Sequence, residues 1–199
     1  MVKADCGGCN GCSRCCHGMG NSIILDPYDV YRMTTGMGKS MQELLAASVE
    51  LNVVDGVILP NLKMQGTEEA CAYLDEEGRC SIHPYRPGIC RLFPLGRYYE
   101  NGGFSYFLQT GECAKENRSK IKVSKWIDTP DLTRNQQFTL QWHDLLHTME
   151  ERLTGEDEEK QQEENLLLLR LFYLLPYKGT TDFYSQFTER MEYWNEQIR

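Results

Sequence analysis

Cysteines are the residues of this chain whose type and spacing point most directly to chemistry. The segment 6–16, CGGCNGCSRCC, holds five cysteines in eleven residues, separated mostly by glycine and small polar residues. The chain has nine in all, at Cys6, Cys9, Cys12, Cys15, Cys16, Cys71, Cys80, Cys90 and Cys113. Thiolates are soft ligands that suit iron–sulfur clusters and zinc. Such density on a glycine-rich segment favours metal binding over cysteines that merely pack as small hydrophobes.

The first cysteines have the spacing of a cluster-binding run. Cys9, Cys12 and Cys15 are two residues apart each time, as in the ferredoxin run that supplies three ligands to one [4Fe–4S] cluster. Structural zinc more often uses two separated Cys-x2-Cys pairs, so the run favours a cluster without excluding zinc. Cys16 follows Cys15 directly, and adjacent side chains leave the backbone in different directions. The two thiols serve different metals, or one binds and one packs, so two metal centres are an option.

The remote cysteines would complete the ligand set, which we expect to leave Cys6 as a spare. The predicted metal ligands are Cys9, Cys12, Cys15, Cys16, Cys71, Cys80, Cys90 and Cys113. For Cys113, packing is as good an explanation as ligation. Arg86 and Arg91 flank Cys90, and we predict that they bind the cofactor by lowering thiol pKa values and offsetting the charge of clustered thiolates. The alternative is that both arginines are solvated or bind the acidic tail.

Histidines offer further ligands. His17 follows Cys16 and could ligate a metal or hydrogen-bond a sulfur, although a solvated loop histidine explains it equally well. The sequence HDLLH at 143–147 places two histidines on one helix face, one residue type away from the H-E-x-x-H motif of zinc proteases. The chain's only other histidines are His17 and His83. We therefore interpret the pair as partly exposed and idle, with a metal site as a minor alternative.

Composition and charge exclude several classes of partner. The net charge is -8 and no cluster of Lys and Arg stands out, so we expect no nucleic-acid partner. The apolar run LLLLRLFYLL at 166–175 is too short and too charged to span a bilayer. The first residues, MVKADCGGC, lack the apolar segment of a secretory signal. We therefore expect a cytoplasmic protein without a membrane partner, whose thiols stay reduced and form no disulfide framework.

The chain divides into two predicted parts at the last cysteine. We predict that residues 1–118 form a loop-rich, metal-stabilised cysteine domain, with short strands at 57–64 and 104–109. Pro27 is placed to be the first residue of a helix. Ser40, with Glu43 three residues later, forms a capping box that begins the next helix.

The second part contains no cysteine, and its apolar residues repeat with a helical period. Residues 119–199 are predicted to form an α-helical region of about three helices: one from Pro130 to about 153, one over 157–175, and one from Thr181 nearly to the last residue. The fold class is therefore α+β. The helical region could shield the metal, mediate dimerisation or dock a protein partner.

Three stretches together resemble a known family. CNGCSRCC (9–16) matches the pattern C-x2-C-x2-C-C, and LDPYDVYRM matches an acidic-residue-then-Arg helix start. CAYLDEEGRCSIHPYRPGICRLFP (71–94) matches the second half, with its Arg-Pro and Cys-Arg-x-Phe-Pro elements. The chain thus resembles the YkgJ-like cysteine cluster family of zinc- or iron-chelating proteins over about residues 9–113. The resemblance implies chelation by the eight predicted ligands, Cys113 less securely. Cys6 extends the cluster upstream, and His83 stands where the family usually has tyrosine.

Chelation fits more than one class of protein. We expect a metal-binding protein that holds an iron–sulfur cluster, [4Fe–4S] by preference, or iron or zinc ions. One alternative is an iron–sulfur-dependent enzyme, methylase-like or redox, because flagellin lysine N-methylases carry a similar cysteine cluster; however, no glycine-rich motif for a nucleotide or methyl donor stands out. Another is a metal chaperone or sensor with exchangeable ligands. The number of metal positions filled by protein ligands would separate these classes. A structural site has all its positions filled by the protein, whereas a catalytic site keeps one open for water or substrate.

Overall fold

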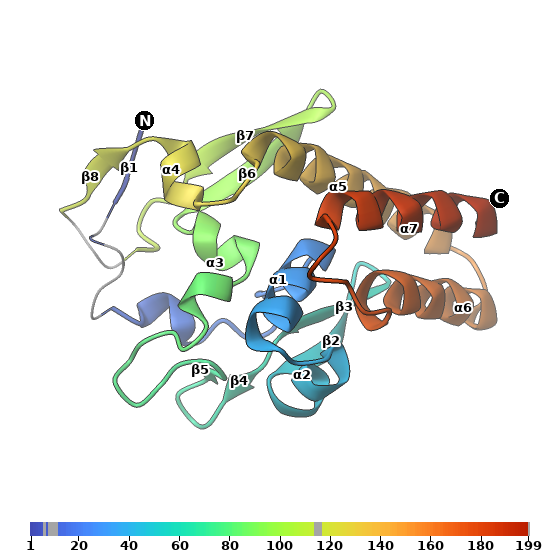
Figure 1. The fold of residues 1–199 in the computed structure, drawn as a ribbon, viewed down its shortest axis with the longest axis horizontal. Coiled ribbons are helices and arrows are strands. Elements are labelled where there is room, and N and C mark those ends of the chain that lie inside the picture. The colour runs from blue at the N-terminus through green and yellow to red at the C-terminus, as the bar shows by residue number, and fades with distance from the viewer. Residues whose placement is uncertain (6, 8–11, 114–116, 199) are drawn as a thin grey trace.

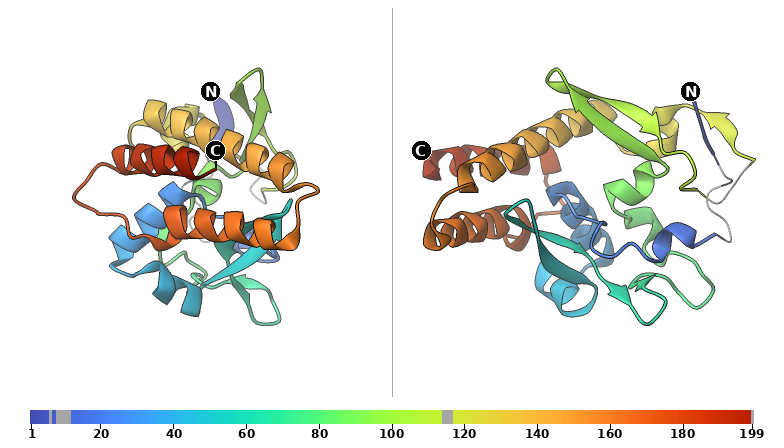
Figure 2. Two further views of the ribbon diagram at one scale, coloured as in Figure 1. Left: turned by 90° about the vertical axis from the view of Figure 1, so that its right-hand side faces the viewer. Right: turned by 180° about the vertical axis from the view of Figure 1, so that it is seen from behind.

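The computed structural model describes residues 1–5, 7, 12–113 and 117–198. Within them the chain forms seven α-helices and four two-stranded antiparallel sheets, which confirms the predicted α+β class. The loops that carry the cysteines lie at one end of the molecule and the long C-terminal helices at the other (Figure 1). The right-hand view in Figure 2 shows the same separation from behind. Two cysteines of the sequence prediction lie outside the described residues: the predicted ligand Cys9 and the predicted spare Cys6.

Helix α1 (Pro27–Met37) crosses the centre of the molecule and begins at a reciprocal cap. The backbone N–H of Asp29 donates to Oδ1 of Asp26 at 2.8 Å, and the N–H of Asp26 donates back to Oδ2 of Asp29 at 3.3 Å. Pro27 is the first helical residue, as predicted, because its missing N–H costs nothing there. The helix ends at Gly38, whose φ of 65° is strained for any residue with a Cβ.

Helix α2 (Met41–Ala47) leads into a hairpin of two six-residue strands. The predicted capping box is confirmed: Ser40 donates its N–H to Glu43 at 2.8 Å, and Glu43 donates its N–H to Oγ of Ser40 at 3.3 Å. The hairpin pairs β2 (Val49–Val54) with β3 (Val57–Leu62), and β3 confirms the first predicted strand. Its turn reaches toward α5 and α6 in both views of Figure 2.

Shorter elements connect and surround the cysteines. The remaining ladders are β1 (Val2–Asp5) with β8 (Ser119–Ile121), β4 (Met64–Gln65) with β5 (Ala70–Cys71), and β6 (Leu95–Glu100) with β7 (Gly103–Leu108). Two short α-helices, α3 (Gly88–Leu92) and α4 (Val123–Ile127), and two 3-10 turns, η1 (Arg14–Cys16) and η2 (His83–Tyr85), lie among them. Strand β7 confirms the second predicted strand.

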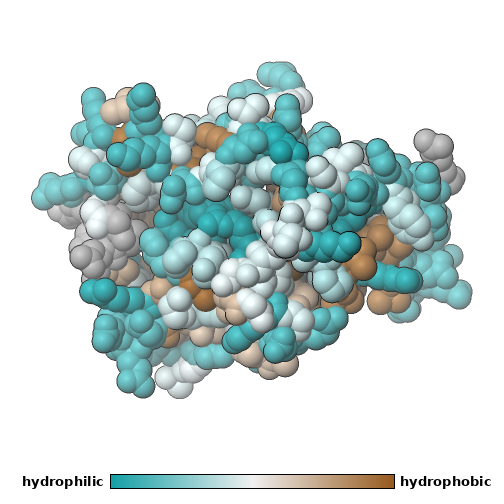
Figure 3. All heavy atoms as spheres, in the orientation of Figure 1, coloured by the Kyte–Doolittle hydropathy of each residue, from teal (hydrophilic) through white to brown (hydrophobic). Residues whose placement is uncertain are grey.

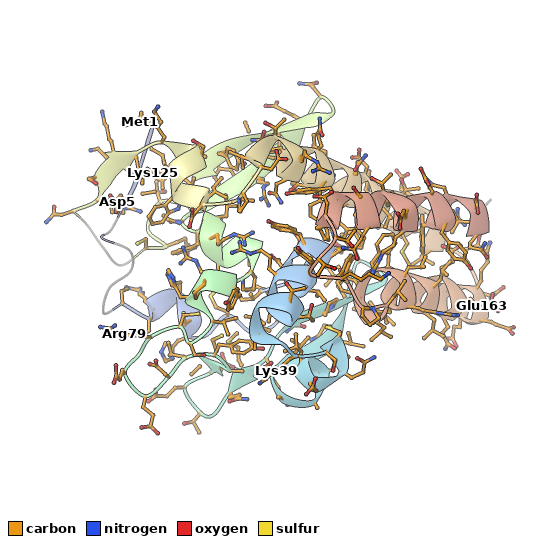
Figure 4. The ribbon with its side chains drawn as sticks, in the orientation of Figure 1. Met1, Asp5, Lys39, Arg79, Lys125 and Glu163 are labelled. Carbon is orange, nitrogen blue, oxygen red and sulfur yellow. The ribbon has the colours of Figure 1, made fainter. Side chains whose placement is uncertain are left out.

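Three long helices form the other end of the molecule, as predicted. They are α5 (Leu132–Leu153), α6 (Glu158–Leu169) and α7 (Phe183–Gln197). Helix α6 continues into a π-helical turn, η3 (Arg170–Leu174), so the whole segment agrees with the single helix predicted over these residues. Figure 4 places Glu163 on the outer side of α6, at the end of the molecule away from Arg79 on the cysteine loops.

One hydrophobic core joins the two ends. Aromatic side chains dominate it: Phe138 lies 4.8 Å from Phe187 between ring centroids, and Trp142 lies 5.2 Å from Phe172. Tyr28 of α1 contacts the same cluster. The face seen in Figure 3 is mostly hydrophilic, with apolar residues gathered near the ends of α6 and α7. A division at residue 118 would concern independent folding units and stays a prediction, since a shared core does not test it.

Candidate metal centre

The first cysteine segment docks on the β4–β5 ladder. Turn η1 carries Cys15 and Cys16, and the next residue, His17, forms a β-bridge with Ala70. Just beyond it, the N–H of Gly18 donates to the carbonyl of Glu69 at 3.0 Å. Because β5 ends with Cys71, this docking brings the thiols of segment 12–16 to the first of the remote cysteines.

A closed loop places Cys71 beside Cys80. Oδ1 of Asp75 accepts the backbone N–H of Glu77 at 3.0 Å and of Arg79 at 2.7 Å, which folds the intervening residues into a tight turn. A β-bridge between Leu74 and Cys80 then joins the two sides of the loop. Tyr73 anchors this loop to the core: its side chain is buried, and its hydroxyl shares a 2.6 Å hydrogen bond with the hydroxyl of Ser48, the residue that follows α2.

Helix α1 positions the third cysteine segment. Oδ1 of Asp29 accepts the N–H of Gly88, the first residue of α3, at 2.6 Å. Asp29 is 2% exposed, so this bond forms inside the protein and fixes α3, which carries Cys90, against the start of α1. Further along α1, Arg32 donates to the carbonyl of Pro84 in η2. The residues between Cys80 and Cys90 are thus held by α1 at two points.

Five thiols gather where these segments meet: Cys15, Cys16, Cys71, Cys80 and Cys90. The charges of neighbouring thiols raise the pKa of Cys16, Cys71, Cys80 and Cys90, and Cys15 is among the thiols that act on each of these four. For Cys71, Cys80 and Cys90, burial is the larger cause of the raised pKa. All five are partly buried free thiols. Without a compensating cation the four thiols with raised pKa values therefore stay protonated, and a bound metal would supply that cation.

Backbone amides are already aimed at two of the sulfurs. A hydrogen bond from the N–H of Tyr73 lowers the pKa of Cys71 and opposes the effect of burial. The N–H of Ile82 does the same for Cys80. Hydrogen bonds to the charged form favour it. Burial still outweighs these hydrogen bonds, so the two amides would stabilise the thiolates once a bound metal supplies positive charge.

Cys15 and Cys16 form a coupled pair. The hydrogen bond between their side chains lowers the pKa of Cys15 to about 6, opposed by burial, and raises the pKa of Cys16. The pair thus loses a first proton easily and keeps the second. Cys15 is the most nucleophilic thiol of the group near neutral pH, because the thiolate is the reactive form.

The two predicted cofactor-binding arginines have different surroundings. The charge of Arg86 lowers the pKa of Cys15 and of Cys80, so its guanidinium lies beside the thiols. Arg91 is 4% exposed, and its Nη2 lies 4.0 Å from Oδ1 of Asp29 with the guanidinium over the Tyr28 ring. Arg91 therefore faces the anchor of α3. Cofactor binding by either arginine stays a prediction.

The other predicted ligands lie at the margin. Cys12 and Cys113 are partly exposed free thiols. His17 has Nδ1 3.4 Å from the carbonyl oxygen of Glu68. Burial and the charge of Arg86 lower the pKa of His83, which favours its neutral, ligating form.

The gathered thiols do not converge on a single point. Among the residues that the structure describes, no three Cys, His, Asp or Glu side chains lie together closely enough to hold one ion. A tetrahedral zinc with Zn–S bonds of about 2.3 Å would place its sulfurs roughly 3.8 Å apart. No three of the five thiols meet this requirement in the part of the chain that the structure describes.

The histidine pair on α5 lies away from this cluster. His143 stacks on Tyr99 with ring centroids 3.8 Å apart, and His147 lies 3.5 Å from Glu150. Both histidines line an open pocket of about 310 Å³ between α5 and the β2–β3 turn. Because no group of three ligating side chains occurs there among the described residues, the interpretation of an idle pair is favoured.

Sequence reasoning missed the role of Asp29. A buried carboxylate that caps α1, accepts from α3 and faces Arg91 organises the site without touching it as a ligand. The local signal was present in Asp26-Pro27 followed by Asp29, which is a capping box with aspartate at its third helical position. The contact to Gly88 spans 59 residues and could not be read from that signal.

Fold and site together define a cysteine-rich domain built to chelate metal. The family model CxxCxxCC, described as "Putative zinc- or iron-chelating domain", matches residues 8–139, and the chain belongs to this family. The match extends beyond the cysteine region and includes the first turns of α5. No curated protein and no solved structure matches the chain. Within the described ranges, no helix combines the length and the apolar character that crossing a membrane requires.

Proposed function

We propose that four thiols of a set of eight, the five gathered ones and the predicted ligands Cys9, Cys12 and Cys113, bind an iron–sulfur cluster. The other four would supply a second metal centre. The observation that carries this proposal is the gathering itself: thiols from three segments lie near one another, although no three ligating side chains among the described residues are close enough to hold one ion. A [4Fe–4S] cluster spreads its irons over the corners of a cube, so its ligating sulfurs lie farther apart than those of one zinc. When bound, such a cluster supplies electron transfer or Lewis acidity.

The residues present fit a charged thiolate centre. Tyr73 and Ile82 donate backbone N–H groups to sulfurs, and Arg86 offsets part of the negative charge. Hydrogen bonds to sulfur and nearby cations stabilise clusters and tune their potentials. Thiolate ligands must stay reduced to bind metal, so the proposed centre implies a reducing compartment, which we propose is the cytoplasm.

The composition of the purified protein tests this proposal. We would purify it without oxygen and measure iron, zinc and labile sulfide per chain together with an absorption spectrum. Iron with matching sulfide, and a broad visible band that bleaches on reduction, is the expected result. Zinc without sulfide or colour would replace the cluster by a zinc centre, and no metal at all would refute chelation by this chain.

Ligand variants locate the centre. Cys71→Ser with Cys80→Ser removes two of the thiols that lie close together, and we expect it to abolish metal retention. Cys113→Ser is the comparison: Cys113 is the least secure of the predicted ligands and is not among the five thiols that gather, so this variant should lose less metal. If the Cys113 variant loses as much metal as the double variant, the centre extends to the chain segment that follows β7.

Partial exposure of the thiols supports a second candidate function, metal delivery or sensing. Ligands that reach the surface can be exchanged with a partner protein or a small chelator. Release of iron or zinc to a chromophoric chelator within minutes, with the helices intact by circular dichroism, would favour this role. A centre that resists the chelator for hours would favour a permanent structural or redox role, including the iron–sulfur enzyme that the resemblance suggested.

A further inference from the structure

The β2–β3 hairpin has a register that decides which of its backbone groups face outward. Its turn is Val54-Asp55-Gly56-Val57, and both central residues have positive φ, 51° and 83°. This is a two-residue turn of the type that matches strand twist, with the two valines as its closing pair. In such a ladder, hydrogen-bonded pairs alternate with pairs whose N–H and C=O point to the outer edges.

The outer edge of β3 has hydrogen-bond partners along its length. The N–H of Ile58 donates to Oδ1 of Asn165 on α6 at 2.6 Å. The carbonyl of Pro60 accepts from the N–H of Leu25 at 2.8 Å, and the N–H of Leu62 donates to the carbonyl of Ile23 at 3.0 Å. The β3 edge of the hairpin is thus covered by α6 and by the segment before α1.

The outer edge of β2 is not used in the same way. Leu51 and Val53 lie opposite Pro60 and Ile58, so their backbone N–H and C=O groups point away from β3. In the part of the chain that the structure describes, no hydrogen-bond partner meets these four groups. The side chains of the same two residues are 43% and 67% exposed.

Neither charge nor proline guards this edge. Soluble proteins usually protect edge strands with lysine, proline or a bulge, because a bare edge is a template for another strand. The only charged residue of β2 is Glu50, and it accepts from Nδ2 of Asn61 at 3.2 Å on the other face of the hairpin. Asn52 is held by the same Asn61 at 2.7 Å. Both polar side chains of β2 are therefore directed toward β3.

We propose that β2 pairs antiparallel with β2 of a second copy of this chain, around a two-fold axis at Asn52. This register places Leu51 opposite the second copy's Val53, and Val53 opposite its Leu51, so each pair exchanges two backbone hydrogen bonds. The result is a four-stranded sheet that runs across both copies.

The sequence of β2, VELNVV, is complementary to itself in this register. Apolar side chains meet apolar side chains on the exposed face, and cross-strand apolar pairs stabilise antiparallel sheets. Glu50 lies opposite Val54 rather than opposite the second copy's Glu50, so no like charges face each other. A shift by two residues, with the axis at Leu51, would place Leu51 opposite the second copy's Leu51 and Val53 opposite its Val49. Charge-paired variants at positions 51 and 53 distinguish that register from the proposed one. A two-fold interface of this kind is self-closing and does not continue into a filament.

The size and charge of the interface set its strength. One short strand buries less surface than a standard stable interface, so we expect weak, concentration-dependent dimerisation. Each copy carries a net charge of -8, and this repulsion is screened by salt. Higher ionic strength should therefore strengthen the dimer.

The experiment is sedimentation velocity of the full, metal-loaded chain over a wide concentration range. The wild type should shift from monomer to dimer as concentration rises. Leu51→Glu and Val53→Lys should each remain monomeric over the same range. Because residue 51 faces residue 53 across the two-fold axis, the double variant should dimerise again through two Glu–Lys pairs.

The matched control is Leu166→Lys, which places the same charge at a 65% exposed leucine on α6. It should dimerise like the wild type. Far-UV circular dichroism checks that every variant is folded, which exposed positions should allow. A wild type that stays monomeric throughout would overturn the proposal, as would a double variant that stays monomeric while the wild type dimerises. Equal disruption by Leu166→Lys would move the interface to α6.

Discussion

The helical end and the cysteine end of this molecule differ in what holds them. At the helical end, α5, η3 and α7 bury rings such as Phe138 and Phe172 against one another. At the cysteine end, strands are short and the chain is held by single bonds to particular groups, such as Asp29 with Gly88. Burial is additive and tolerant, whereas a single buried polar contact is specific and costly to lose. A domain that must present thiols depends on the second kind.

The largest expected effect is at the helical end. Phe138→Ala removes a ring that is almost fully buried among four other aromatic side chains, and should lower the free energy of unfolding by about 3–5 kcal/mol. Urea unfolding followed by circular dichroism measures it, with the exposed Leu166→Ala as control. The loss should be the same before and after chelation. A loss that appears only in the metal-free protein would mean that the two ends do not differ as described.

Asp29→Asn tests the anchor of the cysteine end. It leaves the buried Arg91 without its carboxylate, which should cost about 3 kcal/mol. Because Asp29 also holds α3, the variant should release metal to a chelator faster than the wild type. Asp182→Asn is the control, since it removes an exposed helix cap on α7. Unchanged metal release in the Asp29 variant would show that α3 is positioned by other contacts.

Asn165 connects the two ends. Its side chain accepts from Ile58 and donates to the carbonyl of Gly56, so Asn165→Ala leaves two backbone groups of the hairpin unpaired. We expect a loss of about 1–3 kcal/mol. Hydrogen exchange at the Ile58 amide should accelerate more than exchange within α5. Asn165→Asp keeps the acceptor for Ile58, so this amide should stay protected if the contact is responsible.

The smallest expected effect is on pH dependence at the cysteine end. The pKa of Cys15, lowered to about 6 from an ordinary value of 9, makes this thiol the first to react in the metal-free protein. Its stabilising contribution should be present above pH 9 and be lost as the pH falls through 6. Alkylation by iodoacetamide, mapped by mass spectrometry from pH 5 to 9, should label Cys15 at the lowest pH. Cys16→Ser should raise that midpoint, and a midpoint near 9 in the wild type would contradict the pairing.

The periodicity of apolar residues and the helix-capping residues made much of the fold predictable. The apolar repeat of α5 to α7, the capping box at Ser40 and the turn residues around β3 are local features, so their meaning does not depend on distant residues. The π-helical turn η3 within the predicted second helix is a detail that no spacing indicated. The cysteine-rich segments were recognisable as a metal-binding type by residue chemistry alone.

What the sequence by itself determined is the kind of chemistry and the kind of elements. Thiol spacing indicated chelation, and helical period indicated the C-terminal helices, because both depend on neighbours in the chain. Only the tertiary structure decided which thiols meet, that Arg86 faces them while Arg91 faces Asp29, and that β2 has a bare edge while β3 does not. Each of these depends on contacts between residues tens of positions apart. Their geometry follows from how the packed core closes, and no local pattern encodes it.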